Sequence, residues 1–467
     1  MAQPNIIFIL IDDLGWRDLG CYGSTFYETP NLDRLAAQGM HFTDAYAACP
    51  VCSPTRASLL TGKYPATVGI TDWIDWNGKI HPARGKLIDV PYLKHLPLEE
   101  NNLARVLRAA GYHTWHVGKW HLGGEGYHPN QQGFEVNQGG CHYGSPPAGY
   151  FSPFHIPTLK DGPKGEFLTD RLTDEAIRLI ETNDGHPFFL NLWYYAVHIP
   201  IQAKVEVIQY FEEKARQMGL DQVDPFVVGE LFPCEHKKDQ HVIRRQFQSD
   251  PVYAALVKIL DENIGRLLET LERCQLSENT LVIFTSDNGG LATSEGSPTC
   301  NTPLAEGKGW MYEGGVREPL IIRWPDAIQA GSRCIAPITS PDFFPTILEA
   351  VGLELHPKQH VDGVSFLPYL RGGLPVSREA IFWHYPHYGN QGGKPGASVR
   401  SGDHKLIEFF EDDSIELYNL QQDPGETYDL SKEDPKQADY LRGLLHAWQA
   451  QVKAQHPAPN PNYIPWR

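Results

Sequence analysis

Asn5-Ile-Ile-Phe-Ile-Leu-Ile11 is an unbroken apolar run, and two aspartates, Asp12 and Asp13, follow it directly. The run does not alternate between apolar and polar residues, so it predicts a β-strand that is buried on both faces. Strands of this kind belong to parallel sheets that helices cover on either side. The run is too short for a membrane span and lacks the flanks of a signal peptide.

Helices and buried strands alternate beyond this first strand. Amphipathic patterns predict helices at 31–39, 101–111, 169–182 and 251–274. Apolar runs between them predict strands at 112–117, 187–195 and 281–285. This alternation predicts an α/β fold with a large, mixed but mainly parallel sheet flanked by helices.

The character of the sequence changes at two places. Residues 200–250 are polar and charged, and we expect an irregular insertion there that forms a lid or a contact surface. From residue 371 the chain is rich in Gly and Pro. Two strand-like pieces and a closing helix follow, at 397–400, 405–410 and about 437–453.

We therefore expect two domains. The main α/β domain covers residues 1–370. A smaller C-terminal α+β domain with an antiparallel sheet covers residues 371–467 and contributes to the substrate pocket.

The overall charge and composition exclude several classes of protein. The 467 residues carry a net charge of −17, whereas a nucleic-acid-binding surface is basic, so we expect no nucleic-acid partner. We also expect no membrane span. The eight cysteines are scattered except for Cys49 and Cys52, which argues against a disulfide scaffold. The sequence fits a periplasmic or secreted protein whose leader was removed, and equally a cytoplasmic one.

Polar side chains follow two of the predicted strands. Asp12 and Asp13 come after the first strand, and Asp287 and Asn288 come after the strand at 281–285. Ligands in open α/β sheets bind at the carboxyl ends of strands, so these side chains are expected to lie together. Oxygen ligands of this kind suit a hard cation such as Ca²⁺ or Mg²⁺. The alternative is that both motifs only end strands in turns.

A second motif begins at Cys52 and runs Cys-Ser-Pro-Thr-Arg-Ala-Ser-Leu-Leu-Thr-Gly. Ser53 fits an N-cap, Pro54 the first helical position and Gly62 the C-terminal end, so Cys52 is expected just before a helix. A thiol at a helix N-terminus is expected to have a low pKa. The Cys49-x-x-Cys52 spacing leaves a redox dithiol open, but a zinc site would require a second pair.

Four basic residues complete the candidate site. Lys119 and His121 are two residues apart, so an extended chain would point both the same way. His198 follows the predicted strand at 187–195. Lys308 lies between two glycines, which allow a ligand to approach the backbone closely.

Together these motifs resemble the formylglycine-dependent type I sulfatases of the alkaline-phosphatase superfamily. The family signature is Cys-x-Pro-x-Arg followed by Thr-Gly, matched here by Cys52, Pro54, Arg56, Thr61 and Gly62. Thr55 replaces the more frequent serine, which keeps a hydroxyl. The other blocks fall in the family's order, and the resemblance spans about residues 4–430. It implies an alkaline-phosphatase-like fold and sulfuric ester hydrolysis, closest in character to bacterial carbohydrate sulfatases.

The resemblance also implies residue roles. A separate maturation enzyme would oxidise Cys52 to formylglycine, whose hydrate is the nucleophile. Arg56 would hold this hydrate, His121 would accept a proton during sulfate release, and His198 would protonate the leaving alcohol. Lys119 and Lys308 would bind the sulfate oxygens. The implied ligands of Ca²⁺, with Mg²⁺ also possible, are Asp12, Asp13, Asp287, Asn288 and the oxidised Cys52.

Aromatic and polar residues near these motifs suggest a sugar pocket. The segment from Trp383 to Gly393 resembles a C-terminal segment of bacterial polysaccharide-degrading sulfatases. This favours a sulfated galactose or N-acetylgalactosamine unit, in a glycan or as a small sulfate ester. The candidate substrate-binding residues are Trp73, Asp75, Trp76, His142, Tyr143, His384, His387 and Arg400.

Three other functions remain open on the sequence. A phosphate or phosphonate monoester hydrolase of the same superfamily would share the cysteine motif and the carboxylates. A relative that binds glycans without turning them over would keep the pocket. A redox protein would use Cys49 and Cys52.

Overall fold

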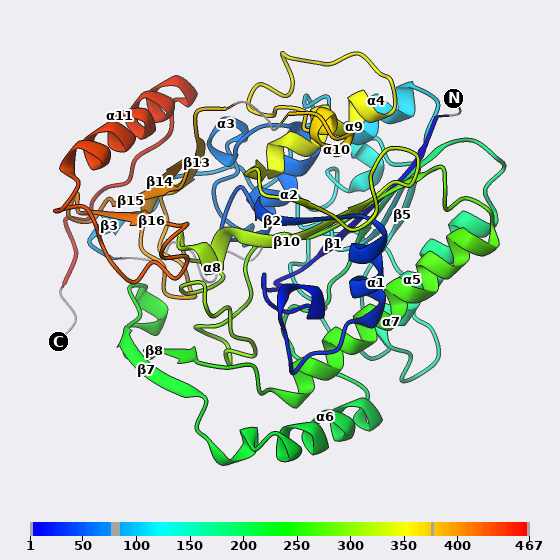
Figure 1. Ribbon diagram of the computed structural model, residues 1–467, viewed down its shortest axis with the longest axis horizontal. Coiled ribbons are helices and arrows are strands. Elements are labelled where there is room, and N and C mark those ends of the chain that lie inside the picture. Colours follow the sequence, from blue (N-terminus) through cyan, green and yellow to red (C-terminus); the bar gives the residue numbers. More distant parts are fainter. Residues whose placement is uncertain (1–2, 76–84, 375–377, 465–467) are drawn as a thin grey trace.

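A nine-stranded sheet forms the centre of the molecule in the computed structural model, which describes residues 3–75, 85–374 and 378–464 (Figure 1). The strands lie in the order β11-β2-β10-β9-β1-β6-β4-β5, and β12 also pairs with β2. Their bounds are Asn5–Ile11 (β1), Met40–Tyr46 (β2), His113–Gly118 (β4), Val136–Gln138 (β5), Phe188–Trp193 (β6), Thr280–Ser286 (β9), Arg317–Arg323 (β10), Ser332–Cys334 (β11) and Ile338–Thr339 (β12).

The sheet is mixed but mainly parallel, as the sequence predicts. β9, β1, β6, β4 and β5 are parallel neighbours. β10 runs antiparallel to both β9 and β2. Five of the nine strands, β2, β5, β10, β11 and β12, are not predicted. β5, β11 and β12 have only two or three residues each, polar residues interrupt Met40–Tyr46, and charged residues lie at the ends of Arg317–Arg323.

Helices cover both faces of this sheet. Ile7, Ile9 and Ile11 of β1 pack in one apolar cluster with α1 (Pro30–Gln38), α5 (Leu168–Glu181) and α7 (Pro251–Arg273). The alternate residues of β1 pack in a second cluster with α2 (Cys52–Thr61), α4 (Leu103–Ala109) and α9 (Phe343–Ala350). Figure 1 shows these two helical layers on opposite sides of the strands. The prediction of a strand buried on both faces is confirmed.

A smaller antiparallel sheet follows in the C-terminal part, in the order β13-β14-β15-β16. Its strands are Ile381–Tyr385, Gly396–Ser401, His404–Phe409 and Ile415–Asn419. The long helix α11 (Pro435–Val452) packs on it through Leu441 and Leu445. Short elements complete the described chain: α3 (Pro65–Val68), α8 (Glu313–Val316), α10 (Leu367–Leu370), β3 (Leu87–Ile88) and β17 (Ala458–Pro459).

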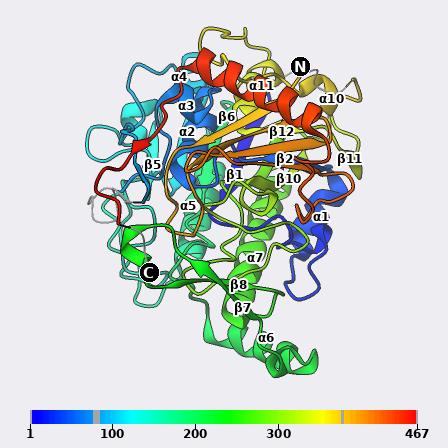
Figure 2. The ribbon, with the colours of Figure 1, turned by 90° about the vertical axis from the view of Figure 1, so that its left-hand side faces the viewer.

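Residues 200–250 are more ordered than their composition suggests. They contain the helix α6 (Val205–Gln217) and a hairpin of β7 (Phe226–Leu231) and β8 (His241–Arg245). Phe211 of α6 packs edge-on against Phe26, with ring centroids 5.7 Å apart. This apolar contact attaches the segment to the main body. The segment lies along one side of the molecule (Figures 1 and 2). The expectation of irregular structure is therefore wrong there.

The topology places four loops at one edge of the sheet. Because β9, β1, β6 and β4 are parallel neighbours, the residues after each strand meet at their common carboxyl end. Within the described residues, no helix has the length and apolarity needed to span a membrane.

Candidate active site

Four acidic or amide side chains meet at the carboxyl ends of β1 and β9. Asp12, Asp13, Asp287 and Asn288 are all buried. The backbone N–H of Asp13 donates to Oδ1 of Asp287 at 3.2 Å, and Nδ2 of Asn288 donates to Oδ1 of Asp13 at 2.8 Å. The sequence prediction that these residues lie together is thus confirmed by the geometry.

Each carboxylate has a cationic partner. Nζ of Lys119 lies 2.5 Å from Oδ2 of Asp12, and Nζ of Lys308 lies 2.7 Å from Oδ2 of Asp13. Arg56 donates from Nε to Oδ2 of Asp287 at 2.8 Å. Its guanidinium also lies 5.1 Å from the ring centroid of Trp193, at the end of β6. The sequence does not predict this cation–π contact. The feature that points to it is Trp193, an aromatic residue near the end of the predicted strand at 187–195.

The charges within this cluster are unevenly balanced. Burial raises the pKa of Asp12 to about 8, although Lys119 opposes this shift. Burial also acts on Asp13, but Lys308 and His198 outweigh it and hold the pKa of Asp13 below its usual range. A further positive charge next to Asp12 would lower the pKa of Asp12 and stabilise its ionised carboxylate.

Two buried oxygens indicate where a cation fits. Oδ1 of Asp12 and Oδ1 of Asn288 have no hydrogen-bond partner among the described residues. Oxygen atoms of Asp12 and Asp287 also lie within 4.8 Å of each other and of the Cys52 sulfur. Buried polar atoms are normally paired, and an all-oxygen set of this kind suits Ca²⁺ or Mg²⁺. The residues present therefore fit a hard divalent cation.

Cys52 is the first residue of α2, and its side chain is only 3% exposed. The helix begins two residues earlier than the sequence predicts, and Gly62 ends it in the left-handed conformation as expected. Burial raises the pKa of the Cys52 thiol even though Lys119 and Lys308 are close. The expectation of a low-pKa thiol is wrong because burial outweighs the helix N-terminus. All eight cysteines are free, including Cys49.

His121 faces the Cys52 sulfur. Its Nδ1 lies 3.3 Å from Sγ, and its Nε2 lies 3.0 Å from the carbonyl oxygen of Ile74. Because a carbonyl only accepts, Nε2 carries the hydrogen and Nδ1 is left as an acceptor toward position 52. Burial, and next Lys119, hold the pKa of His121 well below its usual value, so the imidazole is neutral.

Ser53 does not cap the helix, contrary to its predicted role. Its hydroxyl donates to the carbonyl oxygen of His121 at 2.9 Å and accepts from the N–H of Ile74 at 3.1 Å. One side chain therefore holds both the backbone of His121 and the residue whose carbonyl oxygen accepts the hydrogen bond from His121 Nε2. The sequence alone could not separate this role from capping, because serine is common at both kinds of position.

His198 and Lys308 approach from the other side of Asp13. Nε2 of His198 lies 3.6 Å from Oδ2 of Asp13, while its Nδ1 lies 2.9 Å from the carbonyl oxygen of Ile199. Burial and Lys308 lower the pKa of His198 to about 3. The glycines around Lys308 allow close packing, as the sequence suggests: a Cβ at Gly307 would lie 2.3 Å from the carbonyl oxygen of Gly290.

Four of the predicted substrate residues lie beside His121. Trp73 and Asp75 flank Ile74, whose carbonyl oxygen His121 contacts. His142 and Tyr143 have ring centroids 4.2 Å apart. They precede Gly144, where a Cβ would lie 2.6 Å from the His121 ring. Trp76 lies outside the described residues.

The other three predicted substrate residues are occupied by protein contacts. His387 is buried, with Nε2 2.8 Å from Thr71 Oγ1. His384 is buried and lies 2.8 Å from the carbonyl oxygen of Gln455. Arg400 pairs with Asp44 at 2.7 Å. The structure does not bring His384 and Arg400 into the cluster around Cys52, because His384 of β13 contacts the segment after α11 and Arg400 of β14 contacts Asp44 of β2.

Comparison with known protein families agrees with this arrangement. The family model described as Sulfatase matches residues 4–353. The chain belongs to the sulfatase family. A second model, described as N-sulphoglucosamine sulphohydrolase, C-terminal, matches residues 306–453 of this sulfatase.

Individual relatives are similar over almost the whole chain. A curated sulfatase from Formosa agariphila is 32% identical and covers 96% of this chain and 88% of its own. The N-acetylgalactosamine-6-sulfatase of Homo sapiens is 30% identical, with coverage of 99% and 88%. The solved structure of Ps i-CgsB in complex with k-i-k-neocarrahexaose has a TM-score of 0.76 at 29% identity, with coverage of 99% and 95%. The sulfatase is therefore a sulfuric ester hydrolase with the alkaline-phosphatase-like fold.

Proposed function

We propose that this sulfatase hydrolyses a sulfate ester on a carbohydrate and that its nucleophile is formylglycine, formed from Cys52 by a maturation enzyme. The observation that supports this most directly is the contact of 3.3 Å between Cys52 Sγ and the acceptor nitrogen of His121. A hydrated formylglycine at position 52 would supply one hydroxyl to attack sulfur and a second whose deprotonation expels sulfate. The raised pKa of the unmodified thiol favours a precursor over a thiolate nucleophile.

Asp12, Asp13, Asp287 and Asn288 would hold Ca²⁺, or Mg²⁺, together with the oxidised Cys52. The unpaired Oδ1 atoms of Asp12 and Asn288 support this assignment. When bound, the cation would lower the pKa of the hydrate and orient a sulfate oxygen.

The remaining residues would stabilise negative charge on the sulfate or transfer protons. Lys119, Lys308 and Arg56 bring positive charge next to the position where sulfate develops negative charge. His121 is neutral and directs an acceptor nitrogen at position 52, so it is placed to accept the proton of the second hydroxyl.

His198 would donate a proton to the leaving alcohol, with Lys308 sharing this role. In the structure, the pKa of His198 is lowered by burial and by Lys308. A bound sulfate adds negative charge beside both groups, which opposes the effect of Lys308 and favours protonation.

The proposed substrate is a sulfated galactose or N-acetylgalactosamine unit. Trp73, Asp75, His142 and Tyr143 lie beside His121, where a sugar attached to the sulfate would lie. One relative is named an N-acetylgalactosamine-6-sulfatase, and another was solved with neocarrahexaose. The first name supports an N-acetylgalactosamine unit, and the second supports a sugar substrate.

A panel of sulfated monosaccharides, with matched phosphate esters, tests this proposal. The protein is produced with and without a formylglycine-generating enzyme, and the peptide containing Cys52 is analysed by mass spectrometry. We expect sulfate release in proportion to the oxidised fraction and none above background from Cys52→Ala. Equal turnover by Cys52→Ala would refute the mechanism. Faster phosphate ester hydrolysis, or sugar binding without turnover by matured protein, would refute the proposed reaction.

A further inference from the structure

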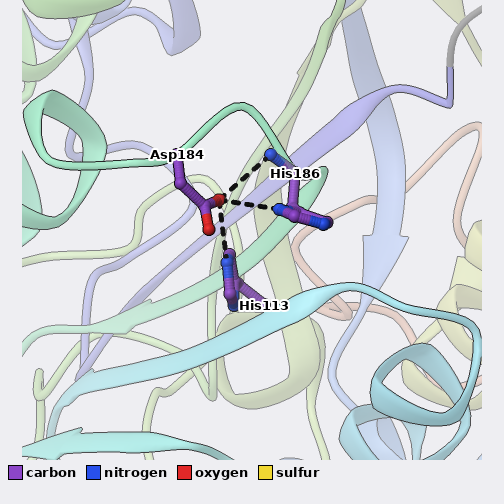
Figure 3. A group of neighbouring side chains, drawn as sticks. All are labelled: His113, Asp184 and His186. Atoms are coloured by element: carbon purple, nitrogen blue, oxygen red, sulfur yellow. Dashed lines mark hydrogen bonds and ion pairs between the residues drawn. The ribbon is translucent and has the colours of Figure 1, made fainter.

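A second group of metal-ligating side chains lies at the opposite edge of the main sheet. His113 is the first residue of β4, so it is at the amino end of a strand whose carboxyl end leads to Lys119. Asp184 and His186 lie in the turn between α5 and β6. Figure 3 shows both imidazole rings beside the Asp184 carboxylate. The proposed catalytic mechanism uses none of these residues.

The three side chains already converge. Oδ1 of Asp184 lies 3.1 Å from Nε2 of His113 and 2.8 Å from Nδ1 of His186. One ligand atom from each residue lies within 4.8 Å of the other two. Zinc bonds of about 2.0–2.2 Å to nitrogen and oxygen would separate neighbouring ligand atoms by roughly 3–3.5 Å, so small side-chain shifts suffice.

Glu135 fixes the orientation of the His113 ring. Its Nδ1 lies 3.0 Å from Oε2 of Glu135, which leaves Nε2 directed at Asp184. Glu135 is itself held by Arg108, 3.5 Å away, and by the N–H of Thr114. A carboxylate on the far nitrogen of a histidine is the arrangement that fixes imidazole ligands in metal sites.

The turn presents the other two ligands from a fixed backbone. Nδ2 of Asn183 donates to the carbonyl oxygen of His186 at 3.0 Å, and the N–H of His186 donates to Asp184 at 3.3 Å. Gly185 supports the turn with φ of 95°. Both His186 and Asp184 are exposed, so an ion could enter from solvent and keep a water ligand.

We propose that His113, Asp184 and His186 form a second metal site, for a borderline divalent ion such as Zn²⁺. Two imidazole nitrogens and one carboxylate oxygen suit Zn²⁺, whereas Ca²⁺ prefers oxygen ligands alone. The ion would fasten the turn between α5 and β6 to the start of β4. This site is independent of the proposed sulfate chemistry and of the cation at the catalytic cluster.

Competition between the protein and a chromogenic zinc chelator tests the site. The full chain carries Cys52→Ala and is saturated with Ca²⁺, so the catalytic cluster contributes little to zinc binding. We expect one equivalent of Zn²⁺ to bind, and His186→Ala to weaken this binding at least tenfold. Asp184→Asn keeps the shape of the turn but removes the anionic ligand, and should also weaken it. His446→Ala is the matched control, since His446 is a half-exposed histidine paired with Glu408 at 2.8 Å.

The melting temperature gives a second measurement. Zn²⁺ should raise it in the Cys52→Ala parent and in the His446→Ala control, but not in His186→Ala, because only the folded state presents the assembled ligands. Glu135→Gln should weaken zinc binding by a factor of about ten or more while leaving the zinc-free melting temperature unchanged. Equal zinc affinity and equal thermal shifts in the parent and His186→Ala would overturn the proposal, as would the absence of zinc binding in the parent.

Discussion

Two opposing effects act on the pKa of the Cys52 thiol. It lies in the first turn of α2, where backbone N–H groups favour an anion, yet burial raises the pKa of its thiol. The sequence reveals the helix but not the burial, because burial depends on residues hundreds of positions away. The same limit explains why the sequence suggests a redox pair at Cys49 and Cys52.

Slow alkylation of Cys52 follows from this environment. In unmodified protein at about pH 8, iodoacetamide should label the partly exposed Cys274 well before Cys52, because only the thiolate reacts and it must be accessible. Peptide mass mapping over time measures both sites in one sample. Cys52 labelling as fast as Cys274 labelling would contradict the raised pKa and the burial, and would revive the redox function.

Ser53→Ala should affect both stability and catalysis. The substitution removes the bonds of Ser53 to the His121 carbonyl and the Ile74 N–H, and we expect unfolding to become easier by about 2 kcal/mol. The value of kcat should fall about tenfold because His121 loses its support. Urea unfolding and sulfate release measure the two effects.

Ser58→Ala is the matched control for Ser53→Ala. Ser58 is a buried serine of the same helix, and its hydroxyl has no partner within the described part of the chain. Its replacement should change neither quantity appreciably. Equal effects of the two substitutions would show that Ser53 acts only through helix packing.

At the scale of elements, α1 is stabilised from outside its own sequence. Asp261 of α7 accepts hydrogen bonds from the N–H groups of Asn31 and Leu32 and from the Asn31 side chain. These N–H groups belong to the first turn of α1, which has no intrahelical partners for them. A helix-capping carboxylate that comes from another helix is not visible in the local sequence.

Asp261→Ala should lower the free energy of unfolding by about 2 kcal/mol or more, because buried N–H groups lose their acceptor. Asp261→Asn retains an oxygen acceptor and should cost less. Urea denaturation of both variants at about pH 7 tests this order. An Asn variant that is as unstable as the Ala variant would show that charge, not hydrogen bonding, dominates.

The raised pKa of Asp261 predicts how its contribution to stability changes with pH. Burial raises its pKa from the ordinary 3.8 to about 6 in the folded protein. Between these values the unfolded chain releases a proton that the folded protein retains, so the contribution to stability is full below 3.8 and is lost as pH rises to about 6. The stability of wild type relative to Asp261→Asn should therefore fall between about pH 4 and pH 6. A rise over this interval would contradict the raised pKa.

The sequence predicts the elements unevenly, for physical reasons. Asn5–Ile11 and the long helix at 251–273 have strong apolar patterns, so both are predicted within one residue of their observed bounds. β2 and β10 carry polar residues that are paired only in the assembled structure. Tyr46 of β2, for example, donates to Glu313 at 2.7 Å, a contact that no local pattern reveals.

At the scale of the whole molecule, the C-terminal sheet is joined to the main body by buried charge. Nζ of Lys405 in β15 lies 2.9 Å from Glu313 and 3.0 Å from Glu426, and all three side chains are fully buried. Glu313 begins α8, five residues after Lys308. The C-terminal sheet therefore supports the loop that presents Lys308.

Lys405→Met should lower the free energy of unfolding by about 3–5 kcal/mol, since it removes a buried cation from beside Glu426 and Glu313, although Arg317 still lies 3.4 Å from Glu313. Lys432→Met, at an exposed position of the C-terminal part, is the control and should have little effect. Chemical denaturation measures both. The triple variant Lys405→Met, Glu313→Gln, Glu426→Gln should recover part of the loss, and no recovery would indicate that packing rather than charge is responsible.

The candidate site shows the same division between predictable and unpredictable features. Asp12 and Asp287 are predicted because the ends of parallel strands fix their place, and Cys52 is predicted because residues typical of a helix start follow it. His384 is placed by the packing of the C-terminal helix and the segment after it, and Arg400 by the docking of the C-terminal sheet on β2; a single sequence reveals neither.

The burial of Cys52 would limit the period in which this residue can be oxidised. Cys52 is 3% exposed and every residue of its helix is buried, so the proposed maturation enzyme would reach the surrounding residues only before they are packed. Oxidation and folding would then compete for the same newly made chain. A chain that folds first would stay unoxidised, and therefore inactive, for as long as it stays folded. How much active enzyme a cell obtains would depend on which of the two processes is faster, rather than on how much protein it makes.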